Sequence, residues 1–254
     1  MSEYVYQDKE ATMPTLSAML TSRIGDGSGD HAAGLLNTIE LLAAARGEGA
    51  MIDIGCGRGR ITELAAPLVR EVVALEPDPG RCNWTRELLA QRENVTVLQQ
   101  FTHEYIADHP EKQFDLTVLS MVVQHLSTHN VAGLMADVAA LTRPGGIAVV
   151  STTHALDKAR CFTYQHVEEA RISEEEFNAY ADDPQNHDKG LPVHRFSREE
   201  FEAIAPADFE MIQWSQFSYY RPEFLERFAQ VHRVEPQELA DHGNSQLMVL
   251  RKRH

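Results

Sequence analysis

Glycines at every second position follow an apolar run, and such a pattern can build a ligand-binding turn. The run contains Asp53, and Gly55, Gly57 and Gly59 come after it. Glycine tolerates positive φ and lets a ligand approach the backbone, and the helical pattern that follows would offer unpaired N–H groups. The dinucleotide fingerprint G-x-G-x-x-G does not fit, because its third glycine would fall on Arg60. No Gly-Lys-Ser/Thr of a phosphate-binding P-loop follows either, so the turn predicts a cofactor of another kind.

Four further motifs follow this turn in order. An acidic residue, Glu76, ends the next apolar run. The others are Phe114-Asp115 at the start of an apolar run, Gln124-His125-Leu126, and the turn Arg143-Pro144-Gly145-Gly146. In this order the five elements resemble the class I S-adenosylmethionine-dependent methyltransferases of the small-molecule type. The resemblance covers roughly residues 50–152, and two later predicted strands fit it more loosely.

The resemblance implies a cofactor, S-adenosyl-L-methionine, and the residues that contact it. Gly55 and Gly57 would let the backbone approach the methionine part, and Asp53 would hold the turn and the amino group of the cofactor. Glu76 would accept hydrogen bonds from both ribose hydroxyls, the task an acidic residue also performs in dinucleotide folds. The residues assigned to the cofactor are Asp53, Gly55, Cys56, Gly57, Glu76, Pro77, Phe101, Thr102, Ser120 and Met121.

One part of the sequence departs from the family pattern. The family usually has an aspartate just after the third strand, where it contacts the adenine amino group, but residues 99–102 contain no acid. Phe101 could stack on the adenine while Thr102 supplies a hydroxyl or a backbone donor. Alternatively, Phe101 belongs to the core. Both interpretations are compatible with the sequence.

Methyl transfer from a sulfonium is a direct displacement, so the enzyme mainly aligns the reacting groups and excludes water. A general base is needed only when the acceptor carries a proton. Histidine titrates near neutral pH, and three candidates lie at suitable places: His125 after the fourth strand, His154 after the fifth and His194 further on. Each is also compatible with a structural role. His187 and Asp188 near His194 fit no tight ligand spacing, so no metal site is predicted.

Short apolar runs alternate with stretches of helical spacing from residue 50 onward. This alternation is typical of a parallel sheet with right-handed crossovers. The fold class is therefore α/β: a Rossmann-like, mostly parallel seven-stranded sheet with helices on both faces, N-terminal helices and a helical insertion after strand 5. Strands are predicted at 51–54, 72–75, 95–98, 114–119, 147–151, 209–217 and 246–250, with helices at 60–68, from Pro79 through Leu89 and through 131–141.

The chain is predicted to form a single domain over residues 1–254. Residues 1–48 would be an N-terminal helical cap, and 50–152 the cofactor-binding core. Residues 154–205 are polar and are expected to be a mainly helical lid insertion, and 206–254 would supply the closing strands. The cap and the insertion together are predicted to form the substrate lid.

Composition restricts the classes of partner. A net charge of −15 opposes broad contact with a phosphate backbone, so nucleic acid is an unlikely partner and a neutral or cationic small-molecule substrate fits better. No apolar run is long enough for a membrane span, and no signal peptide is visible, so a cytoplasmic location is expected. Three widely spaced cysteines indicate neither a disulfide framework nor a zinc site. The oligomeric state is not predicted.

The functional hypothesis is methyl transfer from S-adenosylmethionine to an oxygen or nitrogen of a small-molecule acceptor, with a histidine as general base, and transfer to carbon also stays open. Two alternatives stay open. Gly59-Arg60-Ile61-Thr62 resembles rRNA adenine dimethylases, although Ser120-Met121-Val122-Val123 replaces the Asn-Leu-Pro-Tyr-like motif expected there. The second alternative is a regulatory or partner protein that binds the cofactor without turnover.

Overall fold

A seven-stranded sheet forms the centre of the computed structural model, which describes residues 49–155, 160–164, 167–183, 191–217, 226, 229, 234–238 and 245–254. The strand order is β3-β2-β1-β4-β5-β10-β9. The first five strands in this order pair in parallel, and β10 runs antiparallel to both neighbours. The strands are β1 (Ala50–Ile54), β2 (Glu71–Leu75), β3 (Val95–Leu98), β4 (Phe114–Ser120), β5 (Thr142–Thr153), β9 (Phe209–Phe217) and β10 (Ser245–Lys252). The predicted mostly parallel sheet is confirmed.

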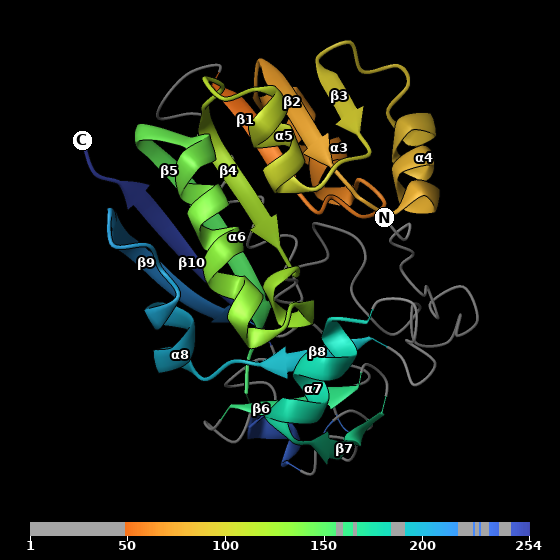
Figure 1. The fold of residues 1–254 in the computed structure, drawn as a ribbon, viewed down its shortest axis with the longest axis vertical. Helices are drawn as coiled ribbons and strands as arrows, with labels where there is room; N and C mark the ends of the chain where they lie inside the picture. The colour runs from red at the N-terminus through yellow and green to blue at the C-terminus, as the bar shows by residue number, and fades with distance from the viewer. Residues whose placement is uncertain are drawn as a thin grey trace.

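Helices cover both faces of this sheet, as predicted (Figure 1). One face packs against α5 (Thr102–Asp108), α6 (Thr128–Leu141) and α8 (Arg198–Ala203). The other packs against α3 (Arg60–Ala65) and the short helix η2 (Ala66–Leu68). Helix α4 (Pro79–Leu88) begins at the predicted proline. Asp78 caps its start, since the Asp78 side chain accepts a hydrogen bond from the backbone N–H of Arg81. Helix α5 was not among the predicted elements.

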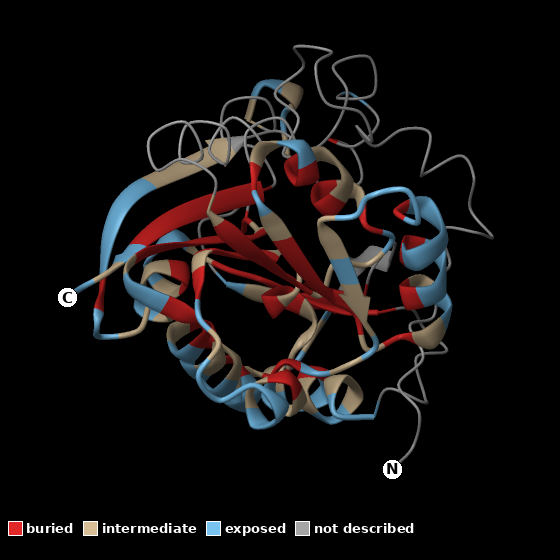
Figure 2. Ribbon diagram, turned by 90° about the horizontal axis from the view of Figure 1, so that it is seen from above, coloured by how far each residue is buried: buried red, intermediate tan, exposed pale blue. Residues whose placement is uncertain are grey.

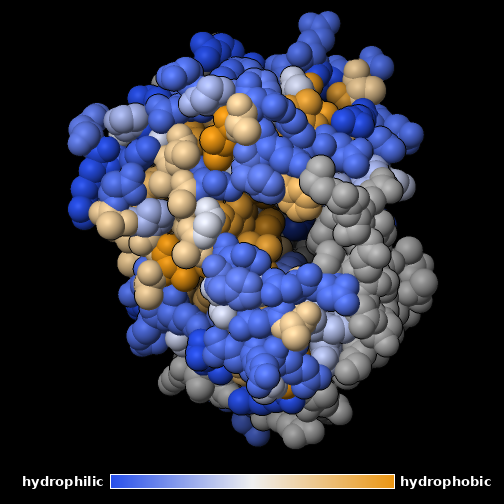
Figure 3. Space-filling view, viewed as in Figure 1, coloured by the Kyte–Doolittle hydropathy of each residue, from blue (hydrophilic) through white to orange (hydrophobic). Residues whose placement is uncertain are grey.

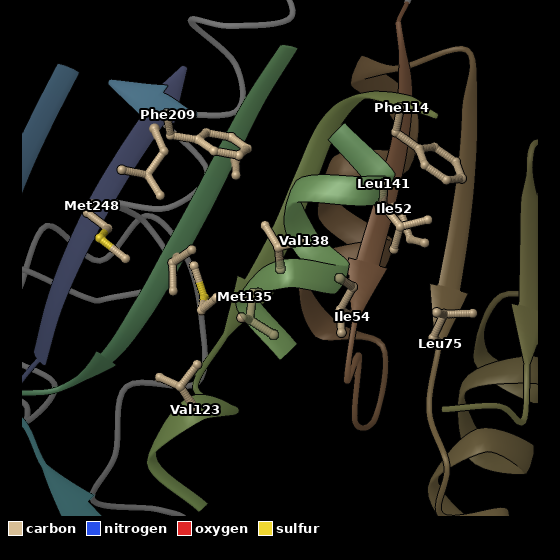
Figure 4. Close-up of a cluster of buried hydrophobic side chains, with 14 of the residues drawn as sticks. Ile52, Ile54, Leu75, Phe114, Val123, Met135, Val138, Leu141, Phe209 and Met248 are labelled. Atoms are coloured by element: carbon tan, nitrogen blue, oxygen red, sulfur yellow. The ribbon is translucent and has the colours of Figure 1, made fainter. Parts of the chain in front are cut away.

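Alternation along the strands divides the core between the two faces. Ile52 and Ile54 of β1 belong to the cluster under α6, whereas Met51 belongs to the cluster under α3. Figure 4 shows Met135 and Val138 of α6 beside the strands of the first cluster. Seen from above, buried residues fill the strands, while the exposed residues of the helices face outward (Figure 2). Each fully buried side chain of this size stabilises the fold by about 1.5–3 kcal/mol.

The insertion after β5 contains a second, three-stranded sheet in addition to helices. Its strands are β6 (Cys161–Tyr164), β7 (Val167–Ile172) and β8 (Pro192–Arg195), in the antiparallel order β7-β6-β8. The predicted helices are present as α7 (Glu174–Ala181) and α8, but the expectation of a mainly helical segment is corrected by these strands. The polar sequence hid them, because β8 buries a proline, a histidine and an arginine instead of an apolar alternation.

Several predictions fall outside the described residues. They are the N-terminal cap at 1–48, His187 and Asp188, and the parts of the insertion at 156–159, 165–166 and 184–190. These stay predictions. Within the described part of the chain, no helix has the length and apolar character needed to cross a membrane.

Candidate functional site

The turn between β1 and α3 can be built only from glycine. Gly55, Gly57 and Gly59 have φ values of 68°, 59° and 76°, in the left-handed region that other residues rarely adopt. A Cβ on Gly55 would lie 2.6 Å from Cγ2 of Val122, and one on Gly59 would lie 2.6 Å from Cγ2 of Thr85. The turn is thus enclosed by the end of β4 on one side and by α4 on the other.

Glu76 directly follows β2, and its carboxylate is directed at this turn. Its Oε2 accepts a hydrogen bond from the backbone N–H of Gly57 at 2.8 Å, and its Oε1 accepts one from Asp78 at 3.0 Å. Burial raises the pKa of Glu76, and the backbone hydrogen bonds from Asp78 and Gly57 oppose that rise. Each carboxylate oxygen has a second lone pair, so Glu76 can also accept hydrogen bonds from the hydroxyls of a ligand.

Asp53 lies buried on β1, immediately before the turn. The hydroxyl of Thr62 donates to its Oδ2 at 2.6 Å, which ties the strand to the first turn of α3. Burial raises the pKa of Asp53 to about 6; the Thr62 hydrogen bond opposes the rise, and the nearby charge of Glu76 adds to it. Two acidic groups therefore face one small region, as a ligand with hydroxyl and amino groups would require.

Two more predicted residues complete the turn and the acidic loop. Cys56 donates its backbone N–H to the carbonyl of Leu75 at 2.9 Å, which joins the turn to β2. Burial raises the pKa of the Cys56 thiol far above its usual range, so the thiol stays protonated and unreactive. Pro77 is half-buried between Glu76 and the start of α4.

At the end of β4, Met121 has φ 57°, the single positive value outside glycine among the described residues. Its N–H donates to the carbonyl of Ser151 at 3.0 Å, and the hydroxyl of Ser151 donates to that of Ser120 at 3.1 Å. A left-handed methionine costs on the order of 1 kcal/mol and marks a position that the surroundings hold in place, as occurs at binding sites. Because β1 and β4 are neighbours, Ser120 and Met121 lie beside the glycine turn, and their contact with the cofactor stays a prediction.

The residues after β3 lie next to the acidic loop. The backbone N–H of Glu76 donates to the carbonyl of Leu98, which places the following segment beside Glu76. The side chain of Phe101 is 40% exposed, so the alternative that placed it in the core is excluded. Its ring stacks on that of His103, and Thr102 is buried at the start of α5. The ring of Phe101 thus lies partly exposed next to the acidic loop.

His125 lies in the short helix η3 (Val123–His125) beyond β4. Its Nδ1 is 2.8 Å from the carbonyl oxygen of Pro192 in β8, and its Nε2 is 3.4 Å from the side-chain nitrogen of Gln124. Both ring nitrogens therefore have partners within the protein.

His154 follows β5 and is buried, 6% exposed. It forms an isolated parallel bridge with Phe196, and its ring meets that of Trp214 edge-on at 6.2 Å. The indole N–H of Trp214 donates to Gln246 of β10 at 3.2 Å. His154 is thus held at the carboxyl end of the sheet, between β5 and β9.

His194 lies inside the insertion. Its Nε2 is 3.1 Å from a carboxylate oxygen of Glu200, and its ring stacks on Phe196 with 3.8 Å between centroids. Burial alone would raise the pKa of Glu200, but hydrogen bonds and charges from His194 and Arg160 hold it below its usual range. The Nδ1 of His194 is buried without a hydrogen-bond partner.

The three histidines share one feature that the sequence did not reveal: each contacts or belongs to the stretch 192–196. Sequence reasoning also missed Thr153 and Gln246, whose side chains donate to carbonyls of that stretch. No motif marks these two residues, and they are found only through the pairing of β10 with β5. In the described part of the chain, no group of three or more His, Cys, Asp or Glu residues is arranged to hold a metal ion.

The surface is hollowed near the place where β4 ends. In Figure 1 the insertion, with β8 and α7, lies beyond the arrowhead of β4, and in the same view Figure 3 shows a hollow with apolar side chains inside it. The carboxyl ends of parallel strands are where open α/β sheets bind their ligands. The glycine turn and the histidines thus flank one region.

Comparison with protein families and sequences points to one class of domain. A family model described as a methyltransferase domain matches residues 52–150. The ubiquinone biosynthesis O-methyltransferase of Rhodopseudomonas palustris (strain BisB18) is 31% identical over 102 residues, which make up 40% of this chain and 39% of that protein. The match therefore spans about two fifths of this relative's length.

Solved structures match over nearly the whole chain. The 1,6-didemethyltoxoflavin-N1-methyltransferase of Burkholderia thailandensis, crystallised with 1,6-didemethyltoxoflavin and S-adenosylhomocysteine, has a TM-score of 0.62 at 16% identity and covers 97% of this chain and 84% of its own. The [4+2]-cyclase SpnF has a TM-score of 0.59 at 15% identity and covers 97% and 94%. At these identities the likeness concerns the fold alone, and one fold can serve many different functions.

Proposed function

Residues 52–150 are a class I S-adenosylmethionine-dependent methyltransferase domain, and on this premise we propose that the chain transfers the methyl group of S-adenosylmethionine to an oxygen or nitrogen of a small molecule. The observation that carries the proposal is the carboxylate of Glu76, fixed by two backbone N–H groups at the rim of a turn that only glycine can form. A fixed carboxylate next to a glycine turn is suited to bind the ribose hydroxyls and the adjoining chain of a nucleoside ligand.

The residues present fit this cofactor. Gly55 and Gly57 give the turn its left-handed backbone, and Asp53 and Glu76 would supply the acceptors for an amino group and two hydroxyls. Ser120 and Met121 line the adjoining end of β4, and the exposed ring of Phe101 offers a stacking surface for the adenine. When bound, S-adenosylmethionine supplies a methyl carbon already activated by its sulfonium.

The chain's own contribution is then alignment, exclusion of water and, for a protonated acceptor, removal of a proton. His154 is the histidine proposed as base, because it directly follows β5, the neighbour of the strand that carries Ser120 and Met121. The ring of His194 is enclosed by aromatic side chains and bonded to Glu200, which favours a role in shaping the insertion.

The names of the relatives support a small-molecule acceptor and leave its atom open between oxygen and nitrogen. One relative is an O-methyltransferase of ubiquinone biosynthesis, and one structural neighbour is an N1-methyltransferase. The net charge of −15 favours a neutral or cationic acceptor over RNA.

Substitution of Glu76 tests the cofactor assignment. We expect Glu76→Ala to weaken S-adenosylhomocysteine binding by roughly tenfold to a hundredfold in calorimetry, because hydrogen bonds to a charged group contribute about 1.5–3 kcal/mol. Glu71→Ala is the matched control, since Glu71 lies at the other end of the same strand, bonded to Lys112. An unchanged affinity in Glu76→Ala would remove the ribose assignment.

A label-transfer assay separates the proposal from a protein that binds the cofactor without using it. A protein that binds the cofactor without methyl transfer is retained as a second candidate because of the likeness to a [4+2]-cyclase. That likeness shows that the fold also serves an enzyme named for another reaction. Label from methyl-labelled S-adenosylmethionine should appear in small phenol, catechol or amine acceptors. Label in RNA would favour the nucleic-acid alternative, and binding without any transfer would favour the cofactor-binding protein.

A further inference from the structure

Strand β8 is an edge strand: side chains contact the carbonyls of Pro192 and His194 on one side, and just beyond the strand the carbonyl of Phe196 accepts the backbone N–H of Ala155 at 2.9 Å as well as a side-chain amide. It is the last strand in the order β7-β6-β8 and begins with Pro192, a residue suited to an edge because it has no N–H to pair. The carbonyls of Pro192, His194 and Phe196 stand at alternate positions and so face the same way. An unpaired edge of this kind needs partners or a cover.

Three side chains from the carboxyl side of the main sheet supply those partners. The Nδ1 of His125 lies 2.8 Å from the oxygen of Pro192, and the hydroxyl of Thr153 donates to that of His194 at 2.9 Å. The amide of Gln246 donates to the oxygen of Phe196 at 3.0 Å. These donors come from η3, which follows β4, and from β5 and β10, so the edge of β8 contacts three neighbouring positions along the carboxyl end of the sheet.

The neighbours of His125 determine which ring nitrogen carries the proton. The hydroxyl of Thr152 donates to Oε1 of Gln124 at 3.1 Å, so the amide nitrogen of Gln124 is the atom that faces Nε2 of His125. A donor opposite Nε2 requires that nitrogen to accept, and the carbonyl opposite Nδ1 requires a donor. The hydrogen bonds thus run in one direction from Thr152 through Gln124 and His125 to the carbonyl of Pro192. In this arrangement the His125 ring is neutral and protonated on Nδ1.

We propose that His125 is a positioning residue that, as the Nδ1–H tautomer, fastens β8 and with it the insertion across the carboxyl end of the sheet. Its Nε2 lone pair is committed to Gln124 and is not offered to a substrate. His125, Thr153 and Gln246 all bind backbone carbonyl oxygens, so the attachment of β8 to the sheet does not depend on the side chains of β8. The consequence for catalysis rests on the proposed function, whereas the tautomer and the fastening do not.

The tautomer is read directly from the wild-type protein without cofactor. In a long-range ¹H–¹⁵N correlation spectrum, His125 should show the pattern of a neutral ring protonated at Nδ1, assigned by its loss in His125→Asn. A ring protonated at Nε2 would overturn the proposal, since it would place a lone pair against the Pro192 carbonyl.

Two substitutions distinguish the effect of losing the Nδ1–H donor of His125 from the effect of losing the volume of its ring. The amide nitrogen of asparagine stands close to the position of Nδ1, and that of glutamine close to Nε2, so only His125→Asn can keep the bond to Pro192. In hydrogen exchange, amides of residues 160–164 and 191–197 should exchange about tenfold faster in His125→Gln and within about twofold of wild type in His125→Asn. Equal exchange in the two variants would overturn the proposal.

A second histidine provides the control. His109 ends α5 with its Nδ1 3.1 Å from a backbone carbonyl, the same kind of contact at the opposite end of the sheet. His109→Gln should leave exchange at residues 191–197 unchanged. For an acceptor identified by label transfer, His125→Gln should raise KM more than it lowers kcat, with S-adenosylhomocysteine affinity within about twofold of wild type. A base would show the reverse, with kcat lost in both His125 variants.

Discussion

The glycine turn and the edge of β8 are two parts of one site that are held together in opposite ways. The turn closes on itself with partners near in sequence: Thr62 bonds to Asp53 nine residues away, and Glu76 bonds to Gly57 nineteen residues away. The edge of β8 depends on partners far away, 67 residues for the His125 contact and 50 for that of Gln246. The glycine turn is thus a local structure, whereas the edge of β8 gains its partners only when the insertion packs against the sheet.

The largest expected effect on stability concerns the glycine turn. Gly55→Ala should lower the free energy of unfolding by about 2–4 kcal/mol, because it combines a left-handed alanine with an overpacked contact. A Cβ at this position would stand 2.6 Å from Val122 with φ at 68°. Urea denaturation measures the loss, and calorimetry should show weaker S-adenosylhomocysteine binding as well.

Gly133→Ala is the matched control for that substitution. Gly133 lies within α6, and a Cβ there would meet nothing within 4 Å. Alanine at this place should raise the free energy of unfolding by roughly 0.5–1 kcal/mol. If the two variants changed stability alike, the turn would not depend on its backbone conformation.

The next largest effect concerns the charge buried beside the turn. Asp53 has a pKa of about 6 in the folded protein against an ordinary value of 3.8. Between about pH 4 and 6 the folded state therefore binds more protons than the unfolded chain, so stability falls as the pH rises and is level above that window. The fall is about 3 kcal/mol, since each pH unit between the two pKa values corresponds to about 1.4 kcal/mol.

Asp53→Asn should abolish that fall, because an amide does not titrate. At pH 7 the variant should be more stable than the wild type by on the order of 1–3 kcal/mol, since asparagine still accepts the hydroxyl of Thr62. Its affinity for S-adenosylhomocysteine should drop, because the charge opposite the amino group is gone. Denaturation at several pH values checks this, and parallel pH profiles for the two proteins would contradict it.

The sequence predicted the local half in detail for a physical reason. Positive φ at Gly55 and an acid at the end of β2 are properties of single positions, and the helix start at Pro79 is a property of a few neighbours. The seven strands were placed within a few residues because their apolar runs are bounded by turns. The long β5, which begins at Thr142 and not at Ile147, is the main deviation.

The edge of β8 could not be predicted from the sequence in the same way. Nothing in Pro192-Val193-His194-Arg195 shows an edge strand, because its ladder partner β6 lies some thirty residues earlier and its other edge is met by side chains. His125 was identified as a candidate from its motif, but its bond to Pro192 depends on the docked insertion. Contacts of this kind follow from tertiary packing and not from any local pattern.

The smallest of the expected effects distinguishes local from distant support within the insertion itself. Asn178 of α7 accepts the N–H of Thr128 at 2.8 Å and so caps α6, a different helix, whereas Ser173 accepts the N–H of Glu176 and caps its own helix. Alanine at either position should cost about 1 kcal/mol, the usual effect of a lost cap. Hydrogen exchange should nevertheless differ, because Asn178→Ala releases the first turn of α6 together with α7, and Ser173→Ala loosens α7 alone. Equal patterns in both variants would mean that Asn178 does not couple α7 to the first turn of α6.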